Sequence, residues 1–316
     1  MHNDTKGFLL IGISTISFSL MSLFVKLCAL PASEIVFIRG LFQTIIAMIA
    51  CYKKEIHPFG PKEMRGLLFF SGLTGGVSVG LYFYCIQFGN LGEITAIFFV
   101  APAVTTILAA IFLKERLRFS AVLSIVLCAI GTALVIKPKF IFPEQIVVDN
   151  PTERTALYIS VFGLFVSAVS YLMISVTGKR SHYLCSVFYF GFLSTLISII
   201  PLVYLRPVSP NWIDVGYLTL IILCAYSGQV TVNYGLQLTS SIATLIRNLD
   251  IVFAFFYSFF IFNETVSVIS IIGAVLICFG TGLIVWDKYR INKKEEFDLL
   301  EEVDLSAVES ETYAHK

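Results

Sequence analysis

The stretches APAVTTILAAIFLKERL (residues 101–117) and DIVFAFFYSFFIFNETV (residues 250–266) decide the fold, because each is an apolar segment that ends in a short acidic turn. A second apolar segment with glycine follows each of them, SIVLCAIGTALVI at residues 124–136 and IIGAVLICFGTGLIV at residues 271–285. Glu115 and Gly131 in the first pair correspond to Glu264 and Gly280 in the second, at an offset of 149 residues. We therefore expect the chain to consist of two equivalent units.

The chain as a whole is also strongly apolar. Of its 316 residues, 57% are hydrophobic and only 14% are charged, and its mean hydropathy is +0.86. Soluble domains average about 45–50% apolar and about 25% charged residues, so a globular core cannot bury this excess. The composition predicts an integral membrane protein and excludes a soluble enzyme, a nucleic-acid-binding protein and a disordered protein.

Ten segments have the length of roughly 20 mainly apolar residues that a transmembrane helix needs. They are residues 7–28, 34–52, 66–88, 92–113, 119–136, 155–177, 182–205, 213–236, 240–262 and 267–286. We therefore predict an all-α integral membrane fold. The seven cysteines are dispersed singly and the four histidines lie at or outside the ends of the spans, so we expect no disulfide framework, no metal site and no cofactor.

The two halves repeat along their whole length. Val36, Phe37, Gly40 and Thr44 match Val187, Phe188, Gly191 and Thr195 at an offset of 151, and Tyr84 and Gln87 match Tyr234 and Gln237 at an offset of 150. Each half has five spans, so the second half enters the membrane from the opposite side. The halves are then inverted repeats, the architecture associated with alternating access.

The quoted stretches resemble the paired EamA repeats of the drug/metabolite transporter superfamily. RNLDIVFAFFYSFFIFNE (residues 247–264) and VIKPKFIF (residues 135–142) are most similar to group G of the eukaryotic solute carrier 35 family. The resemblance implies a ten-helix carrier in which helices one to four and six to nine surround a central cavity and helices five and ten are peripheral. It also implies a small-molecule substrate, without fixing which one.

This organisation divides the chain into four parts. We expect a first EamA repeat at residues 1–136, an inter-repeat loop at 137–154, a second EamA repeat at 155–286 and a disordered cytoplasmic tail at 287–316. Lys and Arg favour the cytoplasmic side of a membrane protein. Placing both termini in the cytoplasm puts 15 of them on that side and four on the other, in a plasma membrane or endomembrane.

Charged residues inside spans mark candidate binding residues, because a charge in hydrocarbon is costly and usually faces the bundle interior. Arg247 and Asp250 lie three residues apart on one face of the ninth span. Arg247 suits a substrate carboxylate or phosphate, because its planar fork holds both oxygens of such a group. Asp250 would hold Arg247 in the empty state or carry a coupled proton. The alternative is a structural ion pair. The first half has Phe98 and Ala101 at these positions, which favours function.

Further polar residues are candidate substrate contacts. Arg39 and Gln43 lie four residues apart on the second span, and Phe190 stands at the repeat position of Arg39. Lys26, near the end of the first span, is a candidate whose alternative is snorkelling to the interface. The eighth span carries a polar stripe of Tyr226, Gln229 and Asn233, which would either contact the ligand or join helices.

Structural roles are expected for residues that both repeats share. An acid near a helix N-terminus is stabilised by the helix dipole and free N–H groups, which is the role we expect of Glu115 and Glu264. We also assign structural roles to Pro102, Gly131 and Gly280. The peripheral helices are candidates for a homodimer contact. EEFDLL at residues 295–300 makes the tail a candidate for a sorting adaptor.

The leading functional hypothesis is a secondary active transporter, and not an enzyme. It would move a small, anionic metabolite by alternating access, through exchange or proton coupling. Two alternatives stay open at this point: a nucleotide-sugar or drug exporter of the same fold, and a non-transporting membrane regulator that keeps the carrier fold. The expected partners are the substrate and the lipid bilayer, with no nucleic acid.

Overall fold

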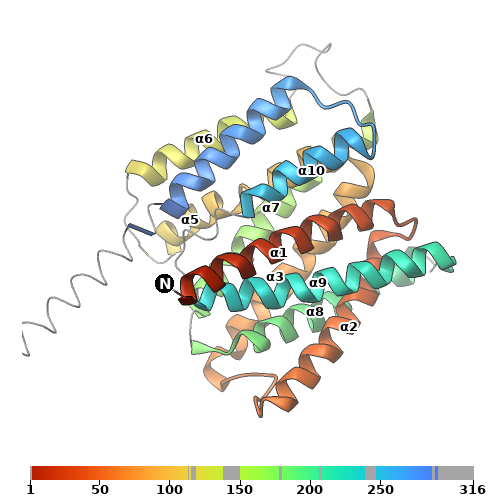
Figure 1. Ribbon diagram of the computed structural model, residues 1–316, viewed down its shortest axis with the longest axis vertical. Coiled ribbons are helices and arrows are strands. Elements are labelled where there is room, and N and C mark those ends of the chain that lie inside the picture. The colour runs from red at the N-terminus through yellow and green to blue at the C-terminus, as the bar shows by residue number, and fades with distance from the viewer. Residues whose placement is uncertain are drawn as a thin grey trace, which may run out of the picture.

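The computed structural model describes residues 2–112, 114, 119–137, 150–177, 180–205, 208–238, 247–286 and 289–290 (Figure 1). The first half contains α1 (His2–Leu27), α2 (Ala32–Lys53), the 3-10 turn η1 (Lys62–Met64), α3 (Arg65–Phe88), α4 (Leu91–Phe98), α5 (Ala101–Phe112) and α6 (Phe119–Ile136). The second contains α7 (Pro151–Thr177), α8 (Tyr183–Leu205), α9 (Trp212–Leu238), α10 (Leu249–Phe260) and a final helix, Val268–Trp286.

The part of the chain described above contains helices and no strand. Nine helical segments in it are long and apolar enough to cross a membrane, with Leu91–Phe112 counted as one, and the apolar α10 is shorter. Helices satisfy their own backbone hydrogen bonds, which a bilayer interior demands. The predicted all-α membrane fold is confirmed.

The fourth span is broken where the sequence analysis expects one helix over residues 92–113. The helical pattern of α4 ends at Phe98, Phe99 and Val100 form a turn, and α5 begins at Ala101. Pro102 lies in the first turn of α5, where its missing N–H costs no intrahelical hydrogen bond. In the second half α10 begins at Leu249, which is the repeat position of Val100. The two repeats thus begin a helix within one residue of the same position.

Helices α2 and α8 meet at two equivalent glycines. A Cβ atom on Gly40 would lie 2.6 Å from Thr195 Oγ1 and 2.9 Å from the carbonyl oxygen of Gly191. A Cβ atom on Gly191 would lie 3.0 Å from Thr44 N and 3.1 Å from the carbonyl oxygen of Gly40. Gly40 and Thr44 are the repeat positions of Gly191 and Thr195. The two halves therefore contribute equivalent residues to both sides of this contact.

Helix α6 and the final helix make a second contact of the same kind. A Cβ atom on Gly131 would lie 2.6 Å from the Gly273 carbonyl oxygen and 2.8 Å from Ile277, and one on Gly280 would lie 2.8 Å from Cys128 Sγ and 3.0 Å from the Ser124 carbonyl oxygen. Exchanging the halves converts one set of contacts into the other. The two self-related contacts define a pseudo-twofold axis, as the inverted repeats predict.

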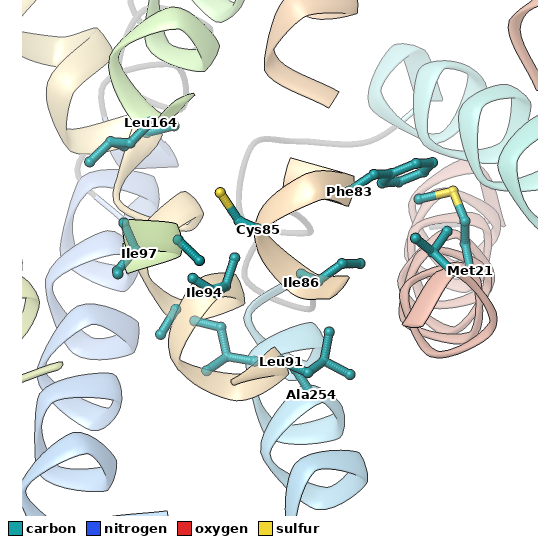
Figure 2. Close-up of a cluster of buried hydrophobic side chains, with 14 of the residues drawn as sticks. Met21, Phe83, Cys85, Ile86, Leu91, Ile94, Ile97, Leu164 and Ala254 are labelled. Atoms are coloured by element: carbon teal, nitrogen blue, oxygen red, sulfur yellow. The ribbon is translucent and has the colours of Figure 1, made fainter. Parts of the chain in front are cut away.

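The larger helix contacts follow the same symmetry. Helix α1 packs along α9, and their repeat equivalents α7 and α3 pack along each other (Figure 1). Helix α4 also contacts α10, so the broken span of the first half meets a helix of the second half. Buried apolar side chains from α1, α3, α4 and α10 lie between these elements, including Met21, Phe83, Ile86, Leu91 and Ala254 (Figure 2).

Candidate functional site

Arg247 lies where the two halves meet. It belongs to a 3-10 turn immediately before α10, and its guanidinium lies 5.6 Å from the ring centroid of Phe18 and 6.0 Å from that of Phe99. Phe18 belongs to α1 and Phe99 to the break between α4 and α5, so the cation of the second half rests on aromatic rings of the first. Such cation–π contacts stabilise a desolvated guanidinium while leaving its N–H groups for hydrogen bonds.

Asp250 is the second residue of α10 and is 7% exposed. Two ion pairs in the described part of the chain, Lys26–Glu264 and Lys137–Glu93, include neither Arg247 nor Asp250. The charges of Arg247 and Asp250 nevertheless attract each other. Asp250 lies in the first turn of α10, where the helix dipole favours a negative charge.

A hydroxyl network lies within electrostatic reach of Asp250. The Tyr82 hydroxyl lies 3.0 Å from Ser22 Oγ and 3.0 Å from Thr95 Oγ1, and its ring packs edge-on against Phe98 at 4.9 Å between centroids. The charge of Asp250 acts on this buried tyrosine. The network joins α1, α3 and α4 at the same place where α10 begins. It is a set of neutral donors and acceptors next to a cation and a carboxylate.

The sequence analysis missed Tyr82, Ser22 and Thr95. An aromatic residue or a hydroxyl in an apolar span is ordinary helix packing unless the direction of its side chain is known. The difference between the halves offered a signal, since Val232 stands at the repeat position of Tyr82. The same comparison had singled out Arg247.

Arg39 and Gln43 lie together inside the molecule. Arg39 is 2% exposed and its guanidinium lies 5.6 Å from the Phe83 ring and 5.3 Å from the Phe190 ring. Gln43 Nε2 donates a hydrogen bond to the Val187 carbonyl oxygen at 3.1 Å. The structure thus buries the pair at the interface of α2 with α3 and α8.

The structure places the residues of the polar stripe of α9 to different degrees. Tyr226 is half-buried and lies within electrostatic reach of Tyr183 and Lys54, on the side of the bundle where Lys54 Nζ donates to the Tyr183 hydroxyl at 3.2 Å. Gln229 has a partner within the protein. The side chain of Asn233 lies outside the described residues. Of the three residues, Tyr226 is therefore the one that the structure places, near Tyr183 and Lys54.

Lys26 and Glu264 form an ion pair with each other. Lys26 Nζ also donates to the Gly89 carbonyl oxygen at 2.5 Å, and Glu264 Oε2 accepts a hydrogen bond from Leu91 N at 3.2 Å. The helix whose N-terminus Glu264 binds is α4, in the other half, and not the helix that follows it in the sequence. The Lys26 side chain is directed into the protein, toward Glu264 and Gly89. Glu115 lies outside the described residues.

A membrane protein of two inverted repeats, with broken helices and polar groups where the repeats meet, has the architecture of a secondary transporter. Both repeats match the model of the EamA-like transporter family, over residues 5–137 and 153–286, and the chain belongs to this family. It is a member of the drug/metabolite transporter superfamily close to group G of the solute carrier 35 family. The expected resemblance is confirmed.

Three relatives and one solved structure show how similar this chain is to known proteins. The chain is 27% identical over 280 residues to solute carrier family 35 member G1 of Mus musculus, which covers 85% of this chain and 75% of the relative. The human member G1 is 28% identical over 272 residues, covering 84% and 74%. Pseudopaline exporter CntI of Pseudomonas aeruginosa is 25% identical over 276 residues, covering 86% and 93%.

One crystal structure of a protein superposes on this chain with a TM-score of 0.58 at 14% identity, over 92% of this chain and 98% of the other. It supports the fold. Together with the family match, the relatives define this chain as an integral multi-pass membrane protein and a transporter, not an enzyme. No group of three or more metal-ligating side chains occurs among the residues that the structure describes.

Proposed function

We propose that this protein is a secondary active carrier that moves a small anionic metabolite across its membrane by alternating access. The observation that carries the proposal is the position of Arg247, on Phe18 and Phe99 at the meeting point of the two repeats. Inverted-repeat carriers bind their substrates at such a junction, where broken helices expose polar groups. A guanidinium there suits a carboxylate or phosphate, which it holds through two parallel hydrogen bonds.

Asp250 supplies the second half of the mechanism. Its buried carboxylate attracts Arg247 when no substrate is present, and an arriving anion competes with it. The carrier then works by exchange if Asp250 stays charged, or by proton coupling if Asp250 takes up a proton as the anion binds. The hydroxyls of Tyr82, Ser22 and Thr95 lie beside this carboxylate and orient the uncharged part of the substrate.

We place both termini in the cytoplasm. The support is the Lys/Arg distribution of 15 against four, which is the strongest orientation signal that a multi-pass sequence carries. An impermeant protease added to sealed, right-side-out vesicles is then expected to leave the C-terminal residue Lys316 protected. Loss of a C-terminal epitope under these conditions would reverse the orientation.

A second candidate function is export of a metabolite that is not an anion. The observation that favours export is the relative named as a pseudopaline exporter, which covers 86% of this chain. A neutral or cationic substrate would leave Arg247 with a structural role. The two candidates therefore differ in whether transport depends on the guanidinium.

The test is counterflow in liposomes that contain the purified full-length protein. The labelled panel holds di- and tricarboxylates, sugar phosphates and nucleotide sugars, followed by neutral and cationic compounds. We expect exchange of one anion class, and Arg247→Gln to lower its rate by tenfold or more, roughly the loss expected for one charge-assisted hydrogen bond. Arg65→Gln, at an exposed arginine on α3, is the matched control and should leave exchange unchanged.

The outcomes separate the candidates. Exchange that disappears in Arg247→Gln but not in Arg65→Gln supports an anion carrier with Arg247 in its site. Repeating the assay with and without a pH gradient then distinguishes proton coupling from exchange. If the folded native protein exchanges no anion but exchanges a neutral or cationic compound, the anion proposal fails.

A further inference from the structure

Arg39 is a buried cation, and two of its three guanidinium nitrogen atoms have no hydrogen-bond partner inside the protein. Its side chain is 2% exposed, and its Nε and Nη1 atoms are buried without a hydrogen-bond partner. Neither of the two ion pairs described above includes it. The groups it touches are two aromatic faces, those of Phe83 on α3 and Phe190 on α8.

Arg39 and the ring of Phe190 lie beside the pseudo-twofold axis between the two halves. Phe190 is the repeat equivalent of Arg39, and each residue directly precedes one glycine of the contact between Gly40 and Gly191. The two halves therefore place a cation and an aromatic ring at equivalent positions beside the pseudo-twofold axis. Phe190 is itself packed against α3, where a Cβ atom on Gly75 would lie 2.8 Å from its ring.

The energetics argue for a ligand at this position. A guanidinium within the membrane-spanning region is costly unless its charge and its N–H groups are compensated. Aromatic faces compensate part of the charge, but they provide no conventional hydrogen-bond acceptors for the five N–H groups of the guanidinium. A structural arginine would be paired with a carboxylate or with carbonyl oxygens, as Lys26 is paired with Glu264 and Gly89.

Gln43 adds a complementary group one helical turn away. Residues four apart lie on the same face of a helix, about 5–6 Å from each other. Gln43 Nε2 is held by the Val187 carbonyl oxygen, which fixes the amide, while Gln43 Oε1 is buried without a donor. Arg39 thus offers unused donors, and Gln43 offers one unused acceptor.

We propose that Arg39 and Gln43 form an anion subsite for a carboxylate that carries a neighbouring hydroxyl or amino group. The carboxylate binds the guanidinium of Arg39, and the hydroxyl or amino group donates to Gln43 Oε1. The inference rests on the proposed function, because alternating access supplies the route to a position that is closed in this structure. It deepens that function by naming the substrate class as hydroxy- or amino-carboxylates.

The experiment compares matched acids on the purified full-length protein. Thermal unfolding in detergent is followed against increasing malate, succinate, aspartate and chloride, because a ligand that binds only the folded state raises the midpoint according to its affinity. We expect malate and aspartate to bind about fivefold to tenfold more tightly than succinate, the ratio that one hydrogen bond supplies. Chloride tests whether a free inorganic anion explains the site.

Three variants assign the effect to residues. Gln43→Leu removes the acceptor and should equalise malate and succinate while both still bind. Arg39→Gln should abolish binding of all three acids, and Arg39→Lys, which keeps the charge without the planar fork, should weaken it. Gln43→Leu leaves Arg39 in place, so the hydroxyl preference stays testable if Arg39→Gln does not fold.

Each result decides the proposal. A hydroxyl preference that is lost in Gln43→Leu supports the subsite. Unchanged binding in a folded Arg39→Gln, or stabilisation by chloride alone, overturns it. Arg247→Gln measured beside these variants separates the two proposals: binding that depends on Arg247 but not on Arg39 leaves the anion carrier standing and removes this subsite, whereas binding of no anion at all removes both.

Discussion

At the scale of single residues, glycine decides how closely the two halves approach. Gly40 is an α2 residue with no room for a side chain, since its Cβ position lies 2.6 Å from Thr195 Oγ1 and 2.9 Å from a backbone oxygen of α8. Small residues at such crossings let membrane helices pack through their backbones. The sequence repeat identified this glycine, and the structure explains why the repeat keeps it.

Gly40→Ala is expected to destabilise the protein by about 1–3 kcal/mol, because a methyl group forces α2 and α8 apart. Gly80→Ala on α3 is the matched control, since nothing lies within 4 Å of its Cβ position and alanine is the better helix former. Thermal unfolding of both variants in detergent provides the measurement. Equal midpoints for the two variants would contradict a tight crossing at Gly40.

The charged residues of the candidate site were the easiest to predict from the sequence. Arg247, Asp250 and Arg39 stand out in an apolar chain because hydrocarbon penalises charge at any helix orientation. Tyr82 does not stand out, because its role depends on whether its side chain points toward the site, and a single sequence does not give that direction. The asymmetry between repeats, with Val232 opposite Tyr82, is the physical signal that a sequence does contain.

At the scale of elements, hydropathy located the spans but not their breaks. The turn at Phe99 and Val100 lies within an uninterrupted apolar run, so no loss of hydropathy marks it. Proline at position 102 was the local signal, because a proline without an N–H group is tolerated in the first turn of a helix and not in its interior. The final position of Glu264 was equally hidden, since its partner α4 is distant in the sequence.

The pair Lys26–Glu264 ties three elements together, namely α1, the N-terminus of α4 and the segment before the final helix. Lys26→Glu and Glu264→Lys should each destabilise the protein by roughly 2 kcal/mol or more, because each leaves a largely buried charge opposed by a like charge. The double exchange should recover part of the loss. Recovery stays incomplete, because a lysine at position 264 cannot accept the hydrogen bond from Leu91 N.

Thermal unfolding midpoints of the three variants measure the coupling between the two positions. Arg65→Glu reverses a charge at an exposed residue and controls for net charge. A double exchange that loses as much stability as the two single variants together would show that Lys26 and Glu264 do not act as a pair.

At the scale of the whole molecule, the contacts between halves differ from one level of the bundle to the next. Along the axis, α2 meets α8 and α6 meets the final helix through glycines, which are contacts of shape alone. Around α4, the contacts are polar: Ser258 Oγ lies 3.1 Å from Asn90 Oδ1 and accepts a hydrogen bond from Gly92 N at 2.9 Å. The glycine contacts suit a pivot between the two halves, because they involve no directional bonds that a rotation of one half against the other would break. The polar contacts around α4 suit a closure between the halves, because a small displacement breaks hydrogen bonds.

If the carrier alternates about this pivot, opening at the end where α1 terminates requires the contacts of Ser258 to break. Ser258→Ala then favours the open form and should raise the labelling rate of Cys28 several-fold, measured with an impermeant maleimide on protein that keeps this cysteine alone. Cys28 is a suitable reporter, because it directly follows α1 and is 4% exposed in this closed arrangement. Thr219→Val removes a hydroxyl that bonds only within its own helix and should leave labelling unchanged. Equal labelling rates of Cys28 in the native protein and in Ser258→Ala would show that the contacts of Ser258 do not form the closure. The pivot at Gly40 would then be tested separately, by cross-linking α2 to α8 and measuring whether transport persists.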